Sequence, residues 1–248
     1  MSEVIYDFSG KNFVVIGASS GIGRQVAKEL AQSGAKVLAI ARRADKLKSL
    51  AQEVENTIAF SAIDVLHQDK MAEAVEEFIQ QNGKLNGCVY TVGIGGLTPL
   101  KAFDPTQAKR IMELSFWQAI FCMQLLVKKK YTEVGSSYVF FSSVAASTGE
   151  KGMFAYAAAK TAIRTAVKSF AKEICGGGHR VNTISPGWVK TEMTEGALEI
   201  DSQEKMLAAH LLGTGQITDV SGVALFLLSD RAGWITGTDI VVDGGYLA

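Results

Sequence analysis

A glycine-rich segment near the amino terminus, residues 17–23 (GASSGIG), limits most strongly what this chain can fold into. It follows an apolar run, residues 12–17, and precedes a helical pattern over residues 24–32. Glycines allow a tight turn and close backbone approach to a ligand, and a helix N-terminus presents free N–H groups to phosphate. This order therefore predicts a dinucleotide loop, although its spacing is G-x-x-x-G-x-G and not the commoner G-x-G-x-x-G.

The rest of the chain repeats apolar strand-like runs between helical patterns. Strands are predicted at residues 12–17, 36–41, 57–62, 85–92, 135–143, 180–185 and 238–242. Their alternation with helices predicts one α/β domain over residues 1–248, a doubly wound Rossmann-type fold. We expect a mostly parallel seven-stranded sheet with helices on both faces. Residues 191–212 break the alternation and are predicted to form a substrate lid.

Two arginines follow the second predicted strand, where such a fold meets the adenosine ribose of a dinucleotide. An acidic residue at this place binds the free 2′-hydroxyl of NAD, but here Ala41 takes the position. Arg42 and Arg43 instead suit a 2′-phosphate, so NADP(H) is the predicted cofactor and NAD(H) the alternative. The competing interpretation is that both arginines only solvate the start of a helix over residues 44–55.

A serine, a tyrosine and a lysine are the candidate catalytic residues. Tyr156 and Lys160 lie four apart in an alanine-rich helical run, so both side chains point the same way. A nearby ammonium favours the phenolate and lowers the pKa of a tyrosine from about 10 towards the working range. Ser143, at the end of the fifth predicted strand, is placed to hold a substrate oxygen. Tyrosine–lysine pairs are also common on ordinary helix surfaces, and it is the convergence with the glycine loop that favours catalysis.

Composition excludes several classes of partner. With 25 basic and 25 acidic residues, the formal net charge is zero, so the overall charge favours neither nucleic acid nor an anionic membrane as a binding partner. The amino-terminal residues do not read as a signal peptide, and no run approaches the ~18 apolar residues of a membrane span. The three cysteines lack metal-ligand or disulfide spacing, so we expect no metal and a cytoplasmic location.

Taken together, the motifs resemble those of the short-chain dehydrogenase/reductase family, in its single-domain branch, over residues 11–246. The shared marks are GASSGIG at 17–23, Asp64, Ser143, YAAAK at 156–160, RVNTISPG at 180–187 and VDGG at 242–245. Within the family, the chain is most similar to the 3-oxoacyl-(acyl-carrier-protein) reductases. Members are usually tetramers or dimers that pair through long helices, here residues 106–130 and 154–175, so the resemblance implies a homotetramer or homodimer.

The resemblance also implies roles for individual residues. Tyr156 would be the general acid/base, Lys160 would bind the nicotinamide ribose and lower the tyrosine pKa, and Ser143 would orient the substrate carbonyl. The expected cofactor-binding residues are Gly17, Ser19, Ser20, Gly21, Ile22, Gly23, Arg42, Arg43, Asp64, Val65, Val92, Gly93, Tyr156, Lys160, Pro186, Val189 and Thr191. Asp64 is expected either to accept from the adenine amine or to cap the following helix.

Two positions depart from the family pattern. The family's Asn-Asn-Ala-Gly after the fourth strand is here residues 90–93 (YTVG), where Thr91 can replace some of the asparagine's hydrogen bonds. Ser115 stands where the family often has an asparagine that holds a proton-relay water near the lysine. A serine can bind water but reaches less far. We therefore include Ser115 among the catalytic candidates and expect a slower or rerouted relay.

The favoured function is an NADPH-dependent carbonyl reductase similar to 3-oxoacyl thioester reductases. One alternative is an NAD-dependent dehydrogenase acting on a sugar or a cyclic secondary alcohol. Another is a nucleotide-sensing regulator that keeps the fold and lacks turnover. The expected partner is a small carbonyl or alcohol substrate, and an acyl-carrier-bound one would call for a basic patch near the crevice. The lysine run 128–130 is one candidate for that patch, although a solvated helix end would look the same.

Overall fold

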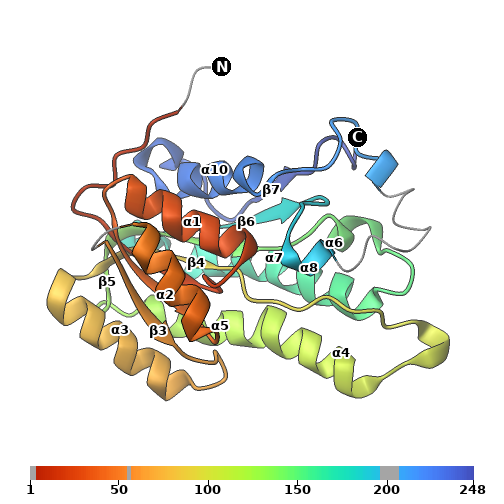
Figure 1. The fold of residues 1–248 in the computed structure, drawn as a ribbon, viewed down its shortest axis with the longest axis horizontal. Coiled ribbons are helices and arrows are strands. Elements are labelled where there is room, and N and C mark those ends of the chain that lie inside the picture. Colours follow the sequence, from red (N-terminus) through yellow and green to blue (C-terminus); the bar gives the residue numbers. More distant parts are fainter. Residues whose placement is uncertain (1–3, 55–56, 196–206) are drawn as a thin grey trace.

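The chain folds around one parallel sheet, as a computed structural model describes it over residues 4–54, 57–195 and 207–248 (Figure 1). Within these residues the strand order is β3-β2-β1-β4-β5-β6-β7, and every neighbouring pair is parallel. The strands are β1 (Asn12–Ile16), β2 (Lys36–Ala41), β3 (Ile58–Ala62), β4 (Leu85–Tyr90), β5 (Thr132–Phe141), β6 (Arg180–Pro186) and β7 (Asp239–Val242). The predicted fold class is confirmed.

Helices cover both faces of the sheet because successive strand side chains point to opposite sides. In β1, Phe13 and Val15 join the core beneath one helical layer, while Val14 and Ile16 join the core beneath the other. The first layer contains α1 (Gly21–Gln32), α2 (Ala44–Glu53) and α10 (Ile217–Leu228). The second contains α3 (Gln68–Asn82), α4 (Pro105–Met112), α5 (Gln118–Leu126) and α7 (Phe154–Ile174).

The order of the strands creates a crevice beside β1. From β1 the chain moves outward through β2 and β3, and then crosses back so that β4 pairs with the other side of β1. In open α/β sheets, ligands bind at the carboxyl ends of strands where the order reverses in this way. The glycine segment follows β1 directly and so lies at this reversal.

The predicted long helix over residues 106–130 is interrupted. It consists of α4, a π-helical segment η2 (Glu113–Trp117) and α5, which ends at Leu126. A π segment inserts an extra residue into the hydrogen-bonded turn, and apolar periodicity does not reveal it. No helix in the described part of the chain is long and apolar enough to cross a membrane.

The lysine run 128–130 falls beyond α5 and just before β5 begins. It therefore lies at the amino-terminal edge of the sheet, opposite this chain's own crevice. Lys130 pairs with Glu76 at 2.8 Å, which suits a solvated helix end. The run is not a basic patch at the mouth of the same chain's crevice.

Two other boundaries bear on the site. β5 ends at Phe141, so Ser143 lies just beyond the strand and before the short helix α6 (Ala145–Thr148). Of the predicted lid, 191–195 and 207–212 are described, with α8 (Glu192–Glu195) following β6. The lid's central part, 196–206, lies outside the described residues.

Candidate active site

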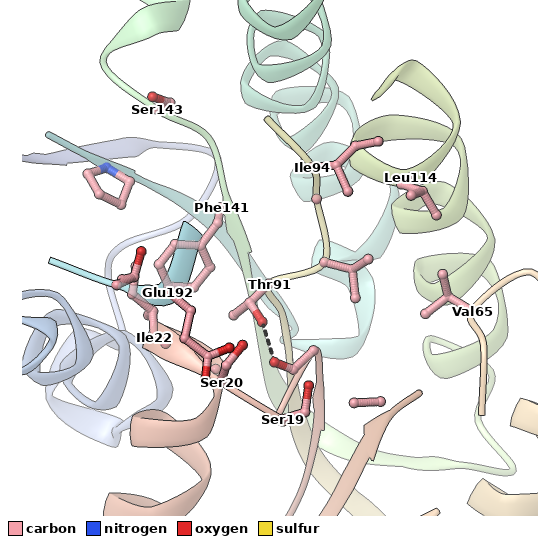
Figure 2. A pocket seen from close by; sticks show the side chains of 18 of the residues that line it. Ser19, Ser20, Ile22, Val65, Thr91, Ile94, Leu114, Phe141, Ser143 and Glu192 are labelled. Carbon is pink, nitrogen blue, oxygen red and sulfur yellow. Dashed lines mark hydrogen bonds between the residues drawn. The ribbon is translucent and has the colours of Figure 1, made fainter. Parts of the chain in front are cut away.

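A cavity of about 340 Å³ lies at the carboxyl ends of the strands, beside the reversal of strand order. Residues from the glycine loop and from the ends of β2, β4, β5 and β6 line it, and Figure 2 shows several of them converging from separate elements. Its lining includes Gly17, Ser19, Ser20, Gly21, Ile22, Gly23, Arg42, Arg43, Asp64, Val65, Val92, Gly93, Ser143, Tyr156, Lys160, Pro186, Val189 and Thr191. Of the predicted site residues, Ser115 does not line this cavity.

The glycine loop leaves no room for side chains at two of its positions. Gly17 has a φ of 99°, which side chains disfavour, and a Cβ at Gly23 would lie 2.5 Å from the Gly17 carbonyl oxygen. The helix α1 starts at Gly21 with no acidic residue in its first turn and no side-chain cap from Ser20. Backbone N–H groups at this end are thus available to an anion, and the cradle fits the pyrophosphate of a dinucleotide.

Thr91 ties the end of β4 to the glycine loop. Its hydroxyl lies 3.1 Å from the carbonyl oxygen of Ile16 and 3.3 Å from that of Gly17, and it donates towards both. One hydrogen bond of Thr91 is drawn in Figure 2. Its backbone N–H also donates to Ile16 at 2.8 Å. Thr91 therefore joins the two central strands at the place where the family pattern has an asparagine.

Lys160 is buried beneath the cavity. Its ammonium donates a 2.9 Å hydrogen bond to the carbonyl oxygen of Phe141 and lies 5.7 Å from the centre of the Tyr156 ring. Burial lowers the pKa of Lys160 to about 8 because the charged form loses its hydration. The Ser142 hydroxyl donates to the Lys160 carbonyl oxygen at 2.8 Å and so ties α7 to the end of β5.

Tyr156 differs from expectation in one respect. Burial raises the pKa of its phenol above 10.0, and a hydrogen bond with the side chain of Ser143 acts in the opposite direction without cancelling the increase. The lowering expected from Lys160 does not prevail, because desolvation penalises the phenolate and the ammonium is directed at the Phe141 carbonyl. The phenol is therefore protonated at neutral pH.

Ser115 lies behind the cavity, in the π segment. It is buried, and its hydroxyl oxygen has no hydrogen-bond partner among the described residues. A Cβ built on Gly93 would lie 3.2 Å from the Ser115 oxygen and 3.3 Å from the Lys160 nitrogen. Ser115 is therefore beside the lysine, as expected, with Gly93 between them, and its hydroxyl has hydrogen-bonding capacity to spare.

The two arginines at the end of β2 have different surroundings. Arg43 donates to the Ser19 hydroxyl at 3.2 and 3.1 Å, to that of Ser20 at 2.5 Å, and to Glu192 at 2.8 Å. Arg43 thus does more than solvate the start of α2. Arg42 is more exposed and approaches Asp64 at 4.0 Å.

Asp64 does not cap the next helix. Its carboxylate accepts from the N–H of Leu66 at 3.1 Å, while α3 begins at Gln68 with His67 as its uncapped N-terminal flank. The capping alternative is therefore wrong. Asp64 lines the cavity, where the adenine alternative stays a prediction.

Although Ala41 and Thr91 were already noted at the ends of their strands, some of the lining residues were not predicted to bind a cofactor or substrate. These are Ala41, Ile63, Thr91, Ile94, Leu114, Phe141, Ser142, Gly187, Glu192 and Thr194. Most of them are next to a predicted site residue in the sequence, and that proximity is the signal that could have found them. Glu192 is different, because nothing local in the sequence indicates that it meets Arg43 across the fold.

Comparison with known proteins agrees with this geometry. A model of the family described as "Enoyl-(Acyl carrier protein) reductase" matches residues 17–247. The 3-oxoacyl-[acyl-carrier-protein] reductase FabG of Thermotoga maritima is 32% identical over 240 residues, covering 95% of this chain and 97% of the relative. That of Staphylococcus aureus is 30% identical over 241 residues, covering 95% of this chain and 97% of the relative.

Two solved structures have the same fold. A short-chain type dehydrogenase/reductase from Mycobacterium ulcerans superposes with a TM-score of 0.91 at 30% identity, covering 97% of this chain and 91% of the other. A 7α-hydroxysteroid dehydrogenase complexed with NADH and 7-oxo glycochenodeoxycholic acid gives a TM-score of 0.91 at 26% identity, covering 96% and 95%. The chain therefore belongs to the short-chain dehydrogenase/reductase family of NAD(P)-dependent oxidoreductases.

Proposed function

We propose that this protein is an NADPH-dependent reductase of carbonyl substrates of the 3-oxoacyl thioester class. The observation that carries the proposal is that Ser143, Tyr156 and Lys160 line one cavity with the glycine loop and with two arginines. The 3-oxoacyl-carrier reductases among the similar proteins support the substrate class. An acyl chain bound to a carrier protein is one form that this substrate would take.

In this reduction, a bound nicotinamide supplies the hydride that adds to the carbonyl carbon. Tyr156 then gives its phenolic proton to the carbonyl oxygen, and its raised pKa keeps that proton in place at neutral pH. Ser143 donates a hydrogen bond to the same oxygen and so orients the carbonyl. The products would be the secondary alcohol, the oxidised cofactor and a Tyr156 phenolate.

Lys160 has two roles in the proposal. As a buried ammonium it stabilises the phenolate that Tyr156 becomes, and it retains that charge below its pKa of about 8. It also binds the ribose next to the nicotinamide. Ser115 and the Lys160 side chain together hold a path for the proton that restores Tyr156.

The preference for NADPH rests on Arg42 and Arg43. Guanidinium groups are strong partners for a phosphate, and Ala41 offers no carboxylate to a free 2′-hydroxyl. Asp64 would accept from the adenine amine, and Pro186, Val189 and Thr191 would contact the nicotinamide end.

A second candidate is an NAD-dependent dehydrogenase of a sugar or a cyclic secondary alcohol. The observation that favours it is the ion pair between Arg43 and Glu192, which occupies one of the two predicted phosphate ligands. One similar structure, the 7α-hydroxysteroid dehydrogenase, contains NADH and a steroid-derived acid.

We also propose that copies of the chain associate as a homotetramer or homodimer through the helices α4–α5 and α7. Trp117 and Phe121, on η2 and α5, are 49% and 37% exposed although both are large and apolar. Burying such side chains against a second copy would remove apolar surface from water.

The proposed function is tested by following NADPH or NADH consumption with a panel of carbonyl compounds. The panel contains 3-oxoacyl thioesters of increasing chain length, sugars and cyclic ketones. The proposal predicts turnover with NADPH and the thioesters. Turnover confined to NADH and cyclic substrates would support the second candidate, and cofactor binding without turnover would indicate a nucleotide-sensing regulator.

A further inference from the structure

Glu192 is held by two cations at the rim of the cavity. One carboxylate oxygen lies 2.8 Å from Arg43 and the other 3.4 Å from Lys46. The hydrogen bond from Arg43 is the main reason that the pKa of Glu192 is lowered, so the carboxylate is charged at neutral pH. The carboxylate of Glu192, from the segment after β6, thus already pairs with the two cationic side chains that follow β2.

The guanidinium of Arg43 has little donor capacity left. Its Nε and one Nη donate to the Ser19 hydroxyl, that same Nη also donates to Ser20, and the other Nη donates to Glu192. A phosphate that binds Arg43 in two places must take over at least one of these bonds. Of the three acceptors, Glu192 is the charged one, so a phosphate that replaces it exchanges one anionic partner of Arg43 for another.

The position of Glu192 makes this exchange direct. Glu192 lines the same cavity as Ser19, Ser20 and Arg43, and Figure 2 shows it near Ser20. The preceding residue, Thr191, approaches the glycine loop closely, with its methyl group 3.6 Å from where a Cβ on Gly21 would lie. The carboxylate is therefore next to the loop that receives the dinucleotide.

We propose that Glu192 is a specificity-determining residue that competes with the 2′-phosphate of NADP(H) for Arg43 and Lys46. This inference rests on the proposed preference for NADPH. A 2′-phosphorylated ligand must displace the carboxylate, whereas a ligand with a free 2′-hydroxyl leaves the pair intact. Glu192 therefore weakens the binding of NADP(H) and not that of NAD(H). It thereby reduces the difference in affinity between the two cofactors.

Ligand binding without turnover tests this competition. Calorimetric titrations compare 2′,5′-ADP with 5′-AMP, which lacks the 2′-phosphate, on wild type and on Glu192→Gln. Exposed ion pairs contribute little, so the variant should bind 2′,5′-ADP about two- to fivefold more tightly and 5′-AMP unchanged. Glu76→Gln is the matched control, because it removes the same charge from an exposed pair with Lys130 on another part of the surface.

A third variant tests whether Arg43 is the group for which Glu192 competes. In an Arg43→Ala background, Glu192→Gln should lose most of its effect on 2′,5′-ADP, because the contested guanidinium is gone. An effect that persisted in full, or a gain shared equally by both ligands, would overturn the inference.

The outcomes separate the two proposals. A wild type that binds 2′,5′-ADP no better than 5′-AMP contradicts the proposed cofactor preference itself. A wild type that does discriminate, combined with a Glu192→Gln variant that binds 2′,5′-ADP equally or more weakly, contradicts the role of Glu192 alone.

Discussion

The ammonium of Lys160 donates to the carbonyl oxygen of Phe141 at 2.9 Å while lying 5.7 Å from the centre of the Tyr156 ring. The charge is therefore buried between the end of β5 and the first turns of α7, held by a backbone acceptor. Both titratable groups are shifted by desolvation, and each shift favours the neutral form. Near neutral pH, Tyr156 is thus a protonated phenol and Lys160 is still mostly a charged ammonium.

The buried charge predicts a pH-dependent stability difference between wild type and Lys160→Met. Between a folded pKa of about 8 and an ordinary value of 10.5, the folded state binds fewer protons than the unfolded state. The cost of burying the charge is therefore fully present below pH 8 and disappears as the pH rises towards 10.5. Relative to wild type, the free energy of unfolding of Lys160→Met should fall by up to about 3 kcal/mol over this range.

Denaturant unfolding at several pH values measures this difference. Lys172→Met is the control, because this lysine is exposed in the last turn of the same helix. Its difference from wild type should stay nearly constant with pH. A Lys160→Met difference that was equally constant would show that the ammonium is not buried at a cost.

Ser115 is predicted to affect proton transfer more than stability. Its buried hydroxyl has no partner among the described residues, so Ser115→Ala should change the free energy of unfolding by about 1 kcal/mol or less. If the hydroxyl takes part in the path beside Lys160, Ser115→Ala should lower turnover and shift its pH profile. Ser115→Asn, with its longer amide, should also change the turnover and the pH profile relative to wild type. Unchanged turnover and pH profiles in both variants would remove Ser115 from the catalytic set.

The glycine loop is predicted not to accept a methyl group at Gly23. A Cβ there would lie 2.5 Å from a backbone oxygen and 2.4 Å from the Thr91 hydroxyl, so the loop must shift. Gly23→Ala should destabilise the fold by about 1–3 kcal/mol and weaken binding of both cofactors. Gly222→Ala is the control, because a Cβ there meets nothing within 4 Å and the residue lies within α10. It should stabilise the fold by about 0.5–1 kcal/mol and leave cofactor binding unchanged.

The arginine pair is predicted to carry the preference for NADPH. Removing both side chains in Arg42→Ala/Arg43→Ala takes away charge-assisted hydrogen bonds to a phosphate. NADPH binding should weaken by about 10- to 100-fold, and NADH binding should change little. Fluorescence titration of both cofactors checks this, and NADH binding that fell to the same extent would point to collapse of the Ser19–Ser20 loop instead. Lys11→Ala, a change outside the cavity lining, serves as a charge control.

Most of the architecture could be predicted from sequence because its signals are local. Most strands contain a short apolar run, and the boundaries of β2 were predicted at both ends. The π segment around Ser115 could not be predicted, since its apolar residues look the same in an α-helix and in a π-helix. The actual ends of the long helix depend on packing, which the periodicity of the residues does not record.

The site residues divide in the same way. The glycine loop, Ser143, Tyr156 and Lys160 belong to contiguous motifs, and the parallel topology brings them to one cavity. The meeting of Arg43 with Glu192 and the raised pKa of Tyr156 depend on tertiary distances and on burial. Neither can be inferred from one sequence, because both arise only when distant segments pack together.

Turnover by Tyr156→Phe tests the central claim most directly. The variant keeps the ring and removes the hydroxyl, and with it the proton that Tyr156 is proposed to give. With NADPH and a 3-oxoacyl thioester, kcat should fall by about 100- to 10,000-fold while NADPH affinity stays within a few-fold of wild type. Tyr6→Phe, a tyrosine outside the cavity lining, should retain full activity. Wild-type turnover in Tyr156→Phe would contradict the account, because the proton would then have another source.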